Sequence, residues 1–326
     1  MFSLVNMKRR ILIIFLAVIM ILASFAGCEK LNKNSVATVD GDNISKEEFN
    51  KNFNMYKKAY ESQYGSDIMS TVVSGDKTFE EVLKEKTLDL LISEKLIVGR
   101  ANEKKIAVSE KDITDQINSY KEELGGEEKY TQFLKDNDMT EEYFKDNIKK
   151  ELLIQKYKDD YINNLKISNE DAKKYFEENK DSFIKIRASH ILLKTEDEAK
   201  KVEERLKKGE KFNDLAYELS IDKVSAAKGG DLGYFTKGQM VEEFDNAAFA
   251  LKVGEVSGIV KTDYGFHIIK VDDKVDQYDK LKEDVIASLK EKKYNEYLTK
   301  LRDEADVKIY LDTATSTKTN NNEEKK

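Results

Sequence analysis

The chain has 326 residues, of which 37% are charged and 40% are hydrophobic, and its formal net charge at pH 7 is −7. The hydrophobic share is sufficient for packed domains, which excludes a wholly disordered chain. The acidic balance argues against nucleic acid as a partner, because phosphate binding needs a clustered surplus of Lys and Arg.

The first 27 residues read as a secretion signal rather than as part of the fold. Three basic residues at 8–10 precede an apolar run over 11–25, which is shorter than the roughly 20 residues of a comfortable membrane span. The run ends at small residues followed by Cys28, the only cysteine of the chain, in a pattern that resembles a bacterial lipobox. Phe25 departs from that pattern, where Leu is usual. The alternative is an ordinary signal in which Cys28 has no role.

Lipidation of Cys28 predicts a protein that is anchored to a membrane and does not span it. Acyl chains contribute about 0.8 kcal/mol per buried CH2 group, so two chains hold a soluble body at the surface. The expected location is the extracytoplasmic face of a Gram-positive type cell membrane. Removal of the signal lowers the formal net charge from −7 to −10, because the signal contains three basic and no acidic residues.

The segment after a short polar tether predicts a hairpin that leads into helices. Two short strands are expected around the Asp-Gly turn between 36 and 44, and Ser45 with Glu48 forms a capping-box pattern that opens a helix. Apolar residues at intervals of three and four then predict helices up to residue 184. The expected helices after the first are 79–100, 110–123, 127–137, 141–165 and 169–179.

Capping residues support these helices to different degrees. Thr140 and Ser168 stand at convincing helix starts. Ser109 is a weaker candidate, because Asp112 occupies the position where a capping box favours Glu or Gln.

Residues 185–274 change character, because glycines concentrate there and β-rich runs appear at both ends. This pattern predicts an α+β module. Its expected strands are 186–193, 255–261 and 265–271, and its expected helices are 198–208, 212–219 and 241–251.

The chain returns to helix over 278–305, with an apolar stripe that needs a partner. The stripe consists of Leu281, Val285, Leu289 and Leu298. The simplest partner is the N-terminal helical region, which makes the module an insertion in a mainly α-helical, chaperone-like body. The expected organisation is a signal at 1–27, a helical region at 28–182, the module at 183–275, a C-terminal helix at 276–312 and a disordered tail at 313–326.

Ordered sequence blocks across 187–272 resemble the parvulin family. The blocks are Arg187–Leu193, Gly209–Phe212, Leu215-Ala216, Gly229–Gly233, Gly238–Met240, Phe244, Ala248-Phe249, Gly254–Ser257 and Tyr264–Lys270. With the signal, the lipobox and the flanking helices, the whole chain resembles the PrsA-type foldase lipoproteins of Gram-positive bacteria. The resemblance implies a small antiparallel sheet with surrounding helices and the activity of a peptidyl-prolyl cis/trans isomerase.

Such an isomerase needs an apolar socket for the proline ring and polar groups that favour the twisted amide over the planar one. By resemblance, the socket consists of Leu232, Met240 and Phe244. The two histidines of the chain, His190 and His267, are expected side by side in the sheet beneath the substrate, either as catalytic groups or as groups that hold the geometry of the site.

The resemblance also places an acidic or thiol residue at the end of a Ser-x-Asp stretch. Asp222 is the favoured candidate, but the loop is one residue longer than in many relatives, which makes Lys223 a rival. A carboxylate there acts electrostatically on the carbonyl of the substrate. Thr262 and Tyr264 are expected at the edge of the site as hydrogen-bond donors.

The expected partners are unfolded or partly folded secreted polypeptides with Xaa-Pro bonds. The acidic loop 194–198 disfavours phosphorylated substrates. The main alternative is a non-catalytic holdase that uses the module only to bind peptides, and a lipoprotein for small solutes finds no support. We expect no cofactor and no metal site, and a homodimer of the helical region is one possibility.

Overall fold

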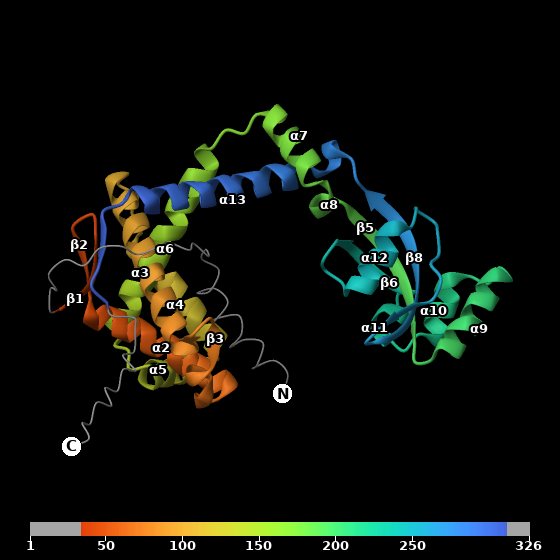
Figure 1. The fold of residues 1–326 in the computed structure, drawn as a ribbon, viewed down its shortest axis with the longest axis horizontal. Coiled ribbons are helices and arrows are strands. Elements are labelled where there is room, and N and C mark those ends of the chain that lie inside the picture. The colour runs from red at the N-terminus through yellow and green to blue at the C-terminus, as the bar shows by residue number, and fades with distance from the viewer. Residues whose placement is uncertain (1–33, 312–326) are drawn as a thin grey trace, which may run out of the picture. The chain divides into compact units, whose positions relative to one another are not determined.

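The computed structural model describes residues 34–311, which form two compact units. Within this range the first unit combines 34–165 with 293–311, and the second comprises 166–292. The chain therefore builds most of the first unit, completes the second, and returns to the first (Figure 1).

Several expectations fall outside the described residues, namely the signal over 1–27, the lipidated Cys28 and the tail over 313–326. Within residues 34–311, every helix is too short or too polar to cross a membrane.

The first unit begins with a hairpin that the C-terminal end of the chain completes. Strands β1 (Ser35–Val39) and β2 (Asp42–Ser45) pair antiparallel, and the turn between them places Asp40 and Gly41 at positive φ, as a tight hairpin requires. The expected hairpin is confirmed. A third strand, β9 (Val307–Ile309), pairs with the other edge of β1 and was not predicted.

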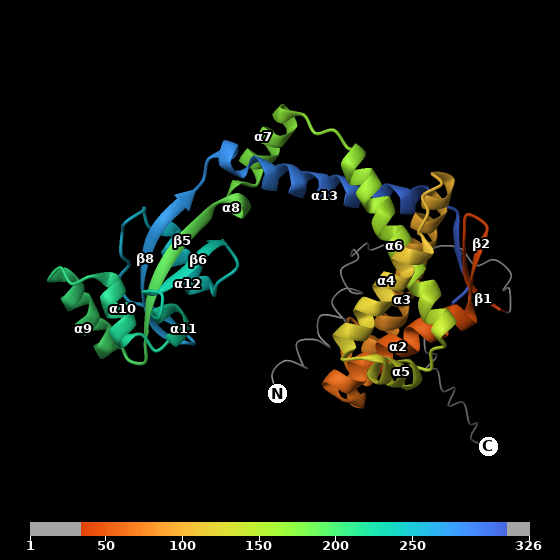
Figure 2. The ribbon, with the colours of Figure 1, turned by 180° about the vertical axis from the view of Figure 1, so that it is seen from behind.

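Five helices follow the hairpin at the places that the apolar periodicity predicts, with bounds within three residues where bounds were predicted. They are α2 (Lys46–Tyr64), α3 (Phe79–Glu103), α4 (Glu110–Leu124), α5 (Glu127–Asp136) and α6 (Glu141–Asn164). Helix α6 packs against both α3 and α4, as Figures 1 and 2 show. The segment before α3 holds a 3₁₀ turn η1 (Ser66–Ser70) and a small hairpin of β3 (Val72–Ser74) and β4 (Lys77–Thr78), which the helical pattern did not indicate.

Serine side chains cap the N-termini of α2 and α4 by accepting backbone hydrogen bonds. The Ser45 hydroxyl accepts from the backbone N–H of Glu48 at 3.1 Å. Ser109 is a stronger cap than expected, because its hydroxyl accepts from the N–H of Asp112 at 3.1 Å while the Asp112 carboxylate accepts from the N–H of Ser109 at 3.2 Å. An aspartate thus completes the box that the pattern reserves for Glu or Gln.

The long C-terminal helix α13 (Tyr278–Glu304) contributes to the cores of both units. Tyr294, Leu298 and Leu301 pack in the core of the first unit. Leu281 and Val285, in contrast, pack against helices α7 (Asn169–Glu178) and α8 (Lys180–Phe183) of the second unit. Helix α7 lies within the helical region 28–182 that we expected as the partner, so both ends of the stripe pack against that region, but the compact units divide it after residue 165. The expected bounds 183 and 275 enclose the sheet but not the whole compact unit.

A four-stranded antiparallel sheet with the order β6-β5-β8-β7 forms the centre of the second unit. The strands are β5 (Lys185–Leu193), β6 (Asp231–Thr236), β7 (Val260–Thr262) and β8 (Gly265–Val275). The expected strands at both ends of the module are confirmed. The one expected over 255–261 is shorter and continues only as an isolated bridge between Val256 and Lys270, and β6 was not predicted.

Helices cover both faces of this sheet, as Figures 1 and 2 show. Helices α9 (Glu196–Lys207) and α10 (Phe212–Leu219) pack on one face through a core that includes Ile191 and Ile268. Helix α12 (Glu242–Ala250) packs on the other face through a core that includes Ala188 and Ile269. The α+β class of the module, set in a mainly helical chain, is therefore confirmed.

Candidate active site

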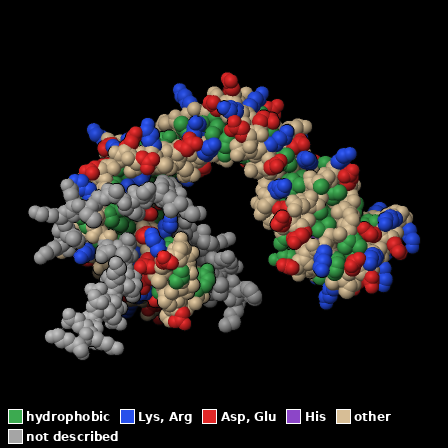
Figure 3. Space-filling view, in the orientation of Figure 1, with side chains coloured by type: hydrophobic (Ala, Val, Ile, Leu, Met, Phe, Trp, Pro, Cys, Tyr) green, Lys and Arg blue, Asp and Glu red, His purple; other side chains and the backbone are tan. Residues whose placement is uncertain are grey.

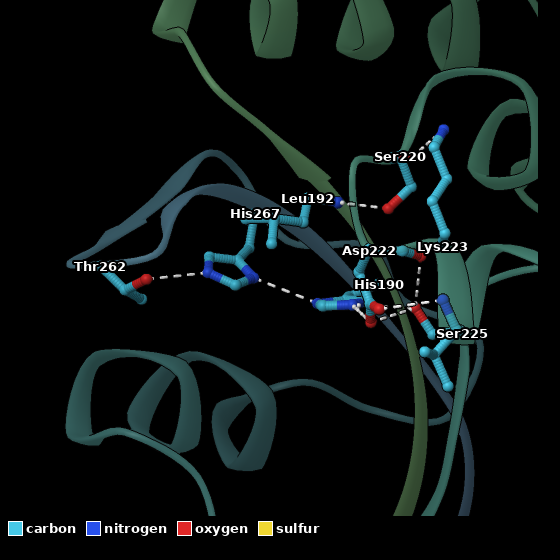
Figure 4. A network of polar contacts seen from close by, with 9 residues as sticks. His190, Leu192, Ser220, Asp222, Lys223, Ser225, Thr262 and His267 are labelled. Atoms are coloured by element: carbon cyan, nitrogen blue, oxygen red, sulfur yellow. Dashed lines mark hydrogen bonds and ion pairs between the residues drawn. The ribbon is translucent and has the colours of Figure 1, made fainter. Parts of the chain in front are cut away.

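The two central strands bring both histidines of the chain together. His190 of β5 pairs with Ile269, and His267 of β8 pairs with Leu192, so the two histidines are diagonal neighbours on adjacent strands. Their Nδ1 atoms lie 3.1 Å apart, and both side chains are buried. Figure 4 shows the two rings in line, as the resemblance predicted.

A loop after α10 delivers a carboxylate to the outer edge of His190. The N–H of Ile221 donates to the carbonyl of Leu192 in β5, which fixes the loop on the sheet. Asp222 then caps the one-turn helix α11 (Lys223–Ala226), and its Oδ2 lies 3.0 Å from His190 Nε2. Lys223, the rival for this position, instead donates to the backbone carbonyl of Ser220 at 2.8 Å.

A threonine engages the opposite edge of His267. Thr262, at the end of β7, places its Oγ1 2.8 Å from His267 Nε2, and the same oxygen accepts from the N–H of Tyr264 at 3.1 Å. The Tyr264 side chain itself is 69% exposed. The predicted polar residues thus form one hydrogen-bonded chain from the β7–β8 turn to Asp222 (Figure 4).

The charge of Asp222 sets the direction of the donors along this chain. Burial acts to raise the pKa of Asp222, but hydrogen bonds from Ser225 and His190 hold that pKa below its ordinary value. An ionised carboxylate can only accept, so His190 carries its proton on Nε2 and presents Nδ1 as an acceptor. His267 then donates from Nδ1, and Thr262 donates to His267 Nε2. The reverse direction would need a protonated Asp222.

Both histidines are therefore neutral at pH 7. Burial lowers the pKa of His190 despite the neighbouring Asp222 carboxylate. Burial, together with the charge that His190 can carry, lowers the pKa of His267 to about 4. Each ring nitrogen of the neutral pair has a partner, which is the condition for burying polar groups without a large cost in free energy.

The three expected socket residues lie in one apolar cluster beside the histidines. The Phe244 ring of α12 meets the rings of His190 and His267 edge to face, with centroids 5.9 and 5.4 Å apart. Leu232 and Met240 pack against the same cluster and remain partly exposed, whereas Phe244 is only 3% exposed. Phe244 thus forms the base of the apolar surface, and Leu232 and Met240 form the part that a ligand can reach.

A glycine lets the segment before β6 approach the histidine strand. Gly230 has φ of +92°, and its carbonyl accepts from the N–H of His190 at 2.9 Å. A Cβ atom on Gly230 would lie 2.5 Å from the carbonyl oxygen of His190, which no side chain can occupy. The Gly229-Gly230 pair therefore serves close packing beside the site.

One residue of the network was not predicted from the sequence. Ser225 is buried in α11, and its Oγ lies 2.5 Å from Asp222 Oδ2 and 3.1 Å from His190 Nε2. The spacing Asp-x-x-Ser across the start of a helix is the signal that could have found it, because an N-cap side chain meets the third residue after it.

The arrangement suits binding and electrostatic stabilisation more than covalent chemistry. It combines an apolar surface, one carboxylate and a neutral histidine pair. Among residues 34–311, acidic, Cys and His side chains nowhere gather in a group of three that could hold a metal ion. On the face of the molecule in Figure 3, Lys and Arg side chains are interspersed with Asp and Glu side chains and form no patch of a single sign.

Comparisons with known proteins show the family of the chain. Residues 173–275 match the family model of the PPIC-type PPIase domain, and residues 1–158 match that of the SurA-like N-terminal domain. The foldase protein PrsA of Caldanaerobacter subterraneus is 37% identical over 91% of this chain and 94% of its own length. PrsA of Bacillus subtilis is 39% identical over 74% of this chain and 82% of its own length.

Solved structures of PrsA proteins also match. The crystal structure from Bacillus subtilis is 40% identical over 75% of this chain and 95% of that chain, with a TM-score of 0.29. The structure from Bacillus anthracis is 32% identical over 66% of this chain and 94% of that chain, with a TM-score of 0.35. The assignment rests on the sequence matches: the chain belongs to the PrsA foldase family and is a peptidyl-prolyl cis/trans isomerase and chaperone with a parvulin-type domain.

Proposed function

We propose that the parvulin-type module isomerises Xaa-Pro bonds with the apolar cluster of Leu232, Met240 and Phe244 as the socket for the proline ring. Phe244 gives this socket a rigid base, and the flexible Met240 adapts to the ring that enters. The Phe244 ring contacts both histidines, which supports a socket in which the bound proline lies beside the polar chain. This contact is the observation that carries the assignment.

Asp222 acts on the amide electrostatically. A planar amide carries extra negative charge on its oxygen because of resonance, and rotation about the C–N bond removes that charge. A carboxylate near the oxygen therefore disfavours the planar state more than the twisted state, which lowers the barrier. The hydrogen bond from His190 keeps the carboxylate in place for this role.

His190 and His267 hold the site in one protonation pattern, and Thr262 extends that pattern to the β7–β8 turn. Because the Thr262 hydroxyl donates to His267, it acts through the histidine and not directly on the substrate. The Tyr264 side chain projects into solvent, so it is the group at this end that can donate to a bound peptide.

The substrates are unphosphorylated, proline-containing segments of unfolded or partly folded secreted polypeptides. The loop that follows β5 contains Glu196, Asp197 and Glu198 in the first turn of α9, and these carboxylates repel a phosphate. The first unit provides the surface that holds such clients, and a homodimer would enlarge it.

The protein is anchored by a lipid on Cys28 at the extracytoplasmic face of the cell membrane. Cys28→Ser should release the protein from the membrane fraction or leave the signal uncleaved. A correctly cleaved Cys28→Ser protein that stays in the membrane fraction would disprove the anchor.

The assignment of Asp222 is tested with the full-length protein and a proline-containing tetrapeptide. We expect Asp222→Asn to lower kcat/KM about 10-fold or more, because it removes the charge and preserves the shape. Lys223→Ala is the matched control, because Lys223 is the adjacent residue of the same loop and contacts only the Ser220 carbonyl in this network. Equal activity of Asp222→Asn and the wild type would remove Asp222 from the mechanism.

A further inference from the structure

Ser225 occupies the junction between the carboxylate and the histidine pair. Its hydroxyl lies within hydrogen-bond distance of both Asp222 Oδ2, at 2.5 Å, and His190 Nε2, at 3.1 Å, and the side chain is 3% exposed. We propose that Ser225 is a positioning residue that fixes the Asp222 carboxylate on His190 and thereby fixes the tautomers of both histidines. This inference rests on the proposed function of Asp222 and the histidine pair.

The donors and acceptors around Ser225 fit this role. The Ser225 hydroxyl donates to Asp222 Oδ2, because an ionised carboxylate only accepts. The Ser225 oxygen and Asp222 Oδ2 both accept from the N–H at His190 Nε2. The other oxygen of Asp222, Oδ1, accepts from the backbone N–H of Val224 at 3.2 Å. Both oxygens are therefore engaged, and the carboxylate cannot rotate without breaking hydrogen bonds in a partly buried site.

Main-chain hydrogen bonds also link Ser225 to His190, through Gly230. The Ser225 carbonyl accepts from the N–H of Gly230 at 2.8 Å, and the carbonyl of Gly230 accepts from the N–H of His190 at 2.9 Å. With the side-chain contacts to Asp222 and His190, these hydrogen bonds close a ring. Because the main-chain part does not depend on the hydroxyl, Ser225→Ala removes the side-chain part alone.

Loss of the hydroxyl should weaken the electrostatic hold on Asp222. Loss of a hydrogen bond to a charged group lowers an equilibrium constant or a rate constant by about a factor of 10. We therefore expect Ser225→Ala to lower kcat/KM about 10-fold and to move the acid limb of its pH profile to higher pH, since the carboxylate becomes easier to protonate. Ser225→Cys keeps most of the volume but has only a weak donor, and we expect a smaller shift in the same direction.

The histidines provide a readout that is independent of activity. The chain contains only two, so ¹⁵N-histidine labelling of the full-length protein yields signals from four ring nitrogens. We expect the wild type to show His190 protonated on Nε2 and His267 protonated on Nδ1, and Ser225→Ala to show a mixture of tautomers.

Ser220→Ala is the matched control. Ser220 is a fully buried serine of the same loop, and its hydroxyl accepts from the N–H of Leu192 at 3.1 Å and is not bonded to Asp222. We expect this variant to be less stable but to keep the acid limb and the tautomers of the wild type. Folding of every variant is checked by hydrogen exchange.

The outcomes separate this inference from the proposed function. A folded Ser225→Ala or Ser225→Cys protein with the acid limb and tautomers of the wild type overturns the role of Ser225, even if its activity falls, because the loss would then be structural. If Asp222→Asn keeps full activity, the proposed function of Asp222 fails, and the tautomers still decide whether Ser225 positions the carboxylate.

Discussion

The two units differ in what they bury. Nine polar or charged residues are buried within residues 34–311, and seven of them belong to the second unit. The two in the first unit, Ser35 and Thr87, bond only to nearby backbone carbonyls. Four of the seven in the second unit, His190, Ser225, Thr262 and His267, belong to one side-chain network.

This difference fits the separate roles proposed for the two units. A fully satisfied buried polar network is worth keeping where it sets a protonation state or aims a charge. The first unit has instead a large aliphatic and aromatic core, in which Tyr157 and Tyr297 join α6 to α13. This core suits the client-holding surface proposed for the first unit, whereas the buried polar network of the second unit suits the proposed catalysis.

The largest effect is expected when the whole sheet of the second unit is removed. We expect a chain without residues 183–275, closed across the gap, to lose all isomerase activity but to remain helical and to suppress aggregation of an unfolded client. Lys185 pairs with Val275 in the β5–β8 ladder, so the cut ends are neighbours. Circular dichroism and light scattering on the deletion protein measure both properties.

The two ways in which the deletion can fail have different meanings. An unfolded deletion protein would show that the helical segments do not form a body of their own. A folded protein that does not suppress aggregation would show that the first unit holds no clients.

The fold could be predicted where the signal is local. Helices α3 to α7 follow from apolar periodicity and caps, which depend on neighbours in the sequence. Strand β9 has three residues and pairs with β1 at the far end of the chain, so no local pattern marks it. The stripe on α13 likewise predicted an apolar partner among the helices before the module, but not that the two compact units divide these helices after residue 165.

A second test removes one buried aromatic ring from each unit. Phe244→Ala should lower kcat/KM strongly and destabilise the second unit by about 3–5 kcal/mol. Phe144→Ala, in the core of the first unit, is the matched change and should leave peptide isomerisation intact. Melting of each variant must accompany the assay, and a folded, fully active Phe244→Ala protein would refute the socket.

The candidate site was predictable to the extent that family motifs carry it. The motifs placed His190, His267 and the socket residues, and the structure brings these together. They did not decide between Asp222 and Lys223, because the path of a loop with one additional residue depends on its backbone hydrogen bonds. Ser225 was missed although its spacing from Asp222 across the start of α11 is a local signal.

A third test measures how the free energy of unfolding depends on pH. Both histidines belong to the second unit, so their titration affects the stability of that unit. The pKa of His267 is about 4 in the folded state and 6.5 in the unfolded state. Between these values only the unfolded state binds the proton, so the free energy of unfolding decreases as the pH falls from 6.5 to 4. The full effect is about 3 kcal/mol, and His190 acts in the same direction.

Urea unfolding of the wild type and His267→Asn at several pH values between 7 and 4 measures this effect. We expect the variant to lose part of the pH dependence, because its side chain does not titrate in this range. An identical slope for both proteins would mean that the pKa of His267 is the same in the folded and unfolded states, which contradicts a neutral, buried His267 at pH 5.

The smallest expected effects come from two matched helix caps, and they test whether the units respond separately. Ser109 caps α4 in the first unit and Ser168 caps α7 in the second, each by accepting from the N–H three residues ahead at 3.0 or 3.1 Å. Replacing either by Ala should cost about 1 kcal/mol. Because distant sites act independently, hydrogen exchange should increase only in the unit that carries the substitution, and kcat/KM should remain that of the wild type for Ser109→Ala. Increased exchange of β5 and β8 in Ser109→Ala would instead show that the units unfold together, and α13, which contributes to both cores, would be the element that couples them.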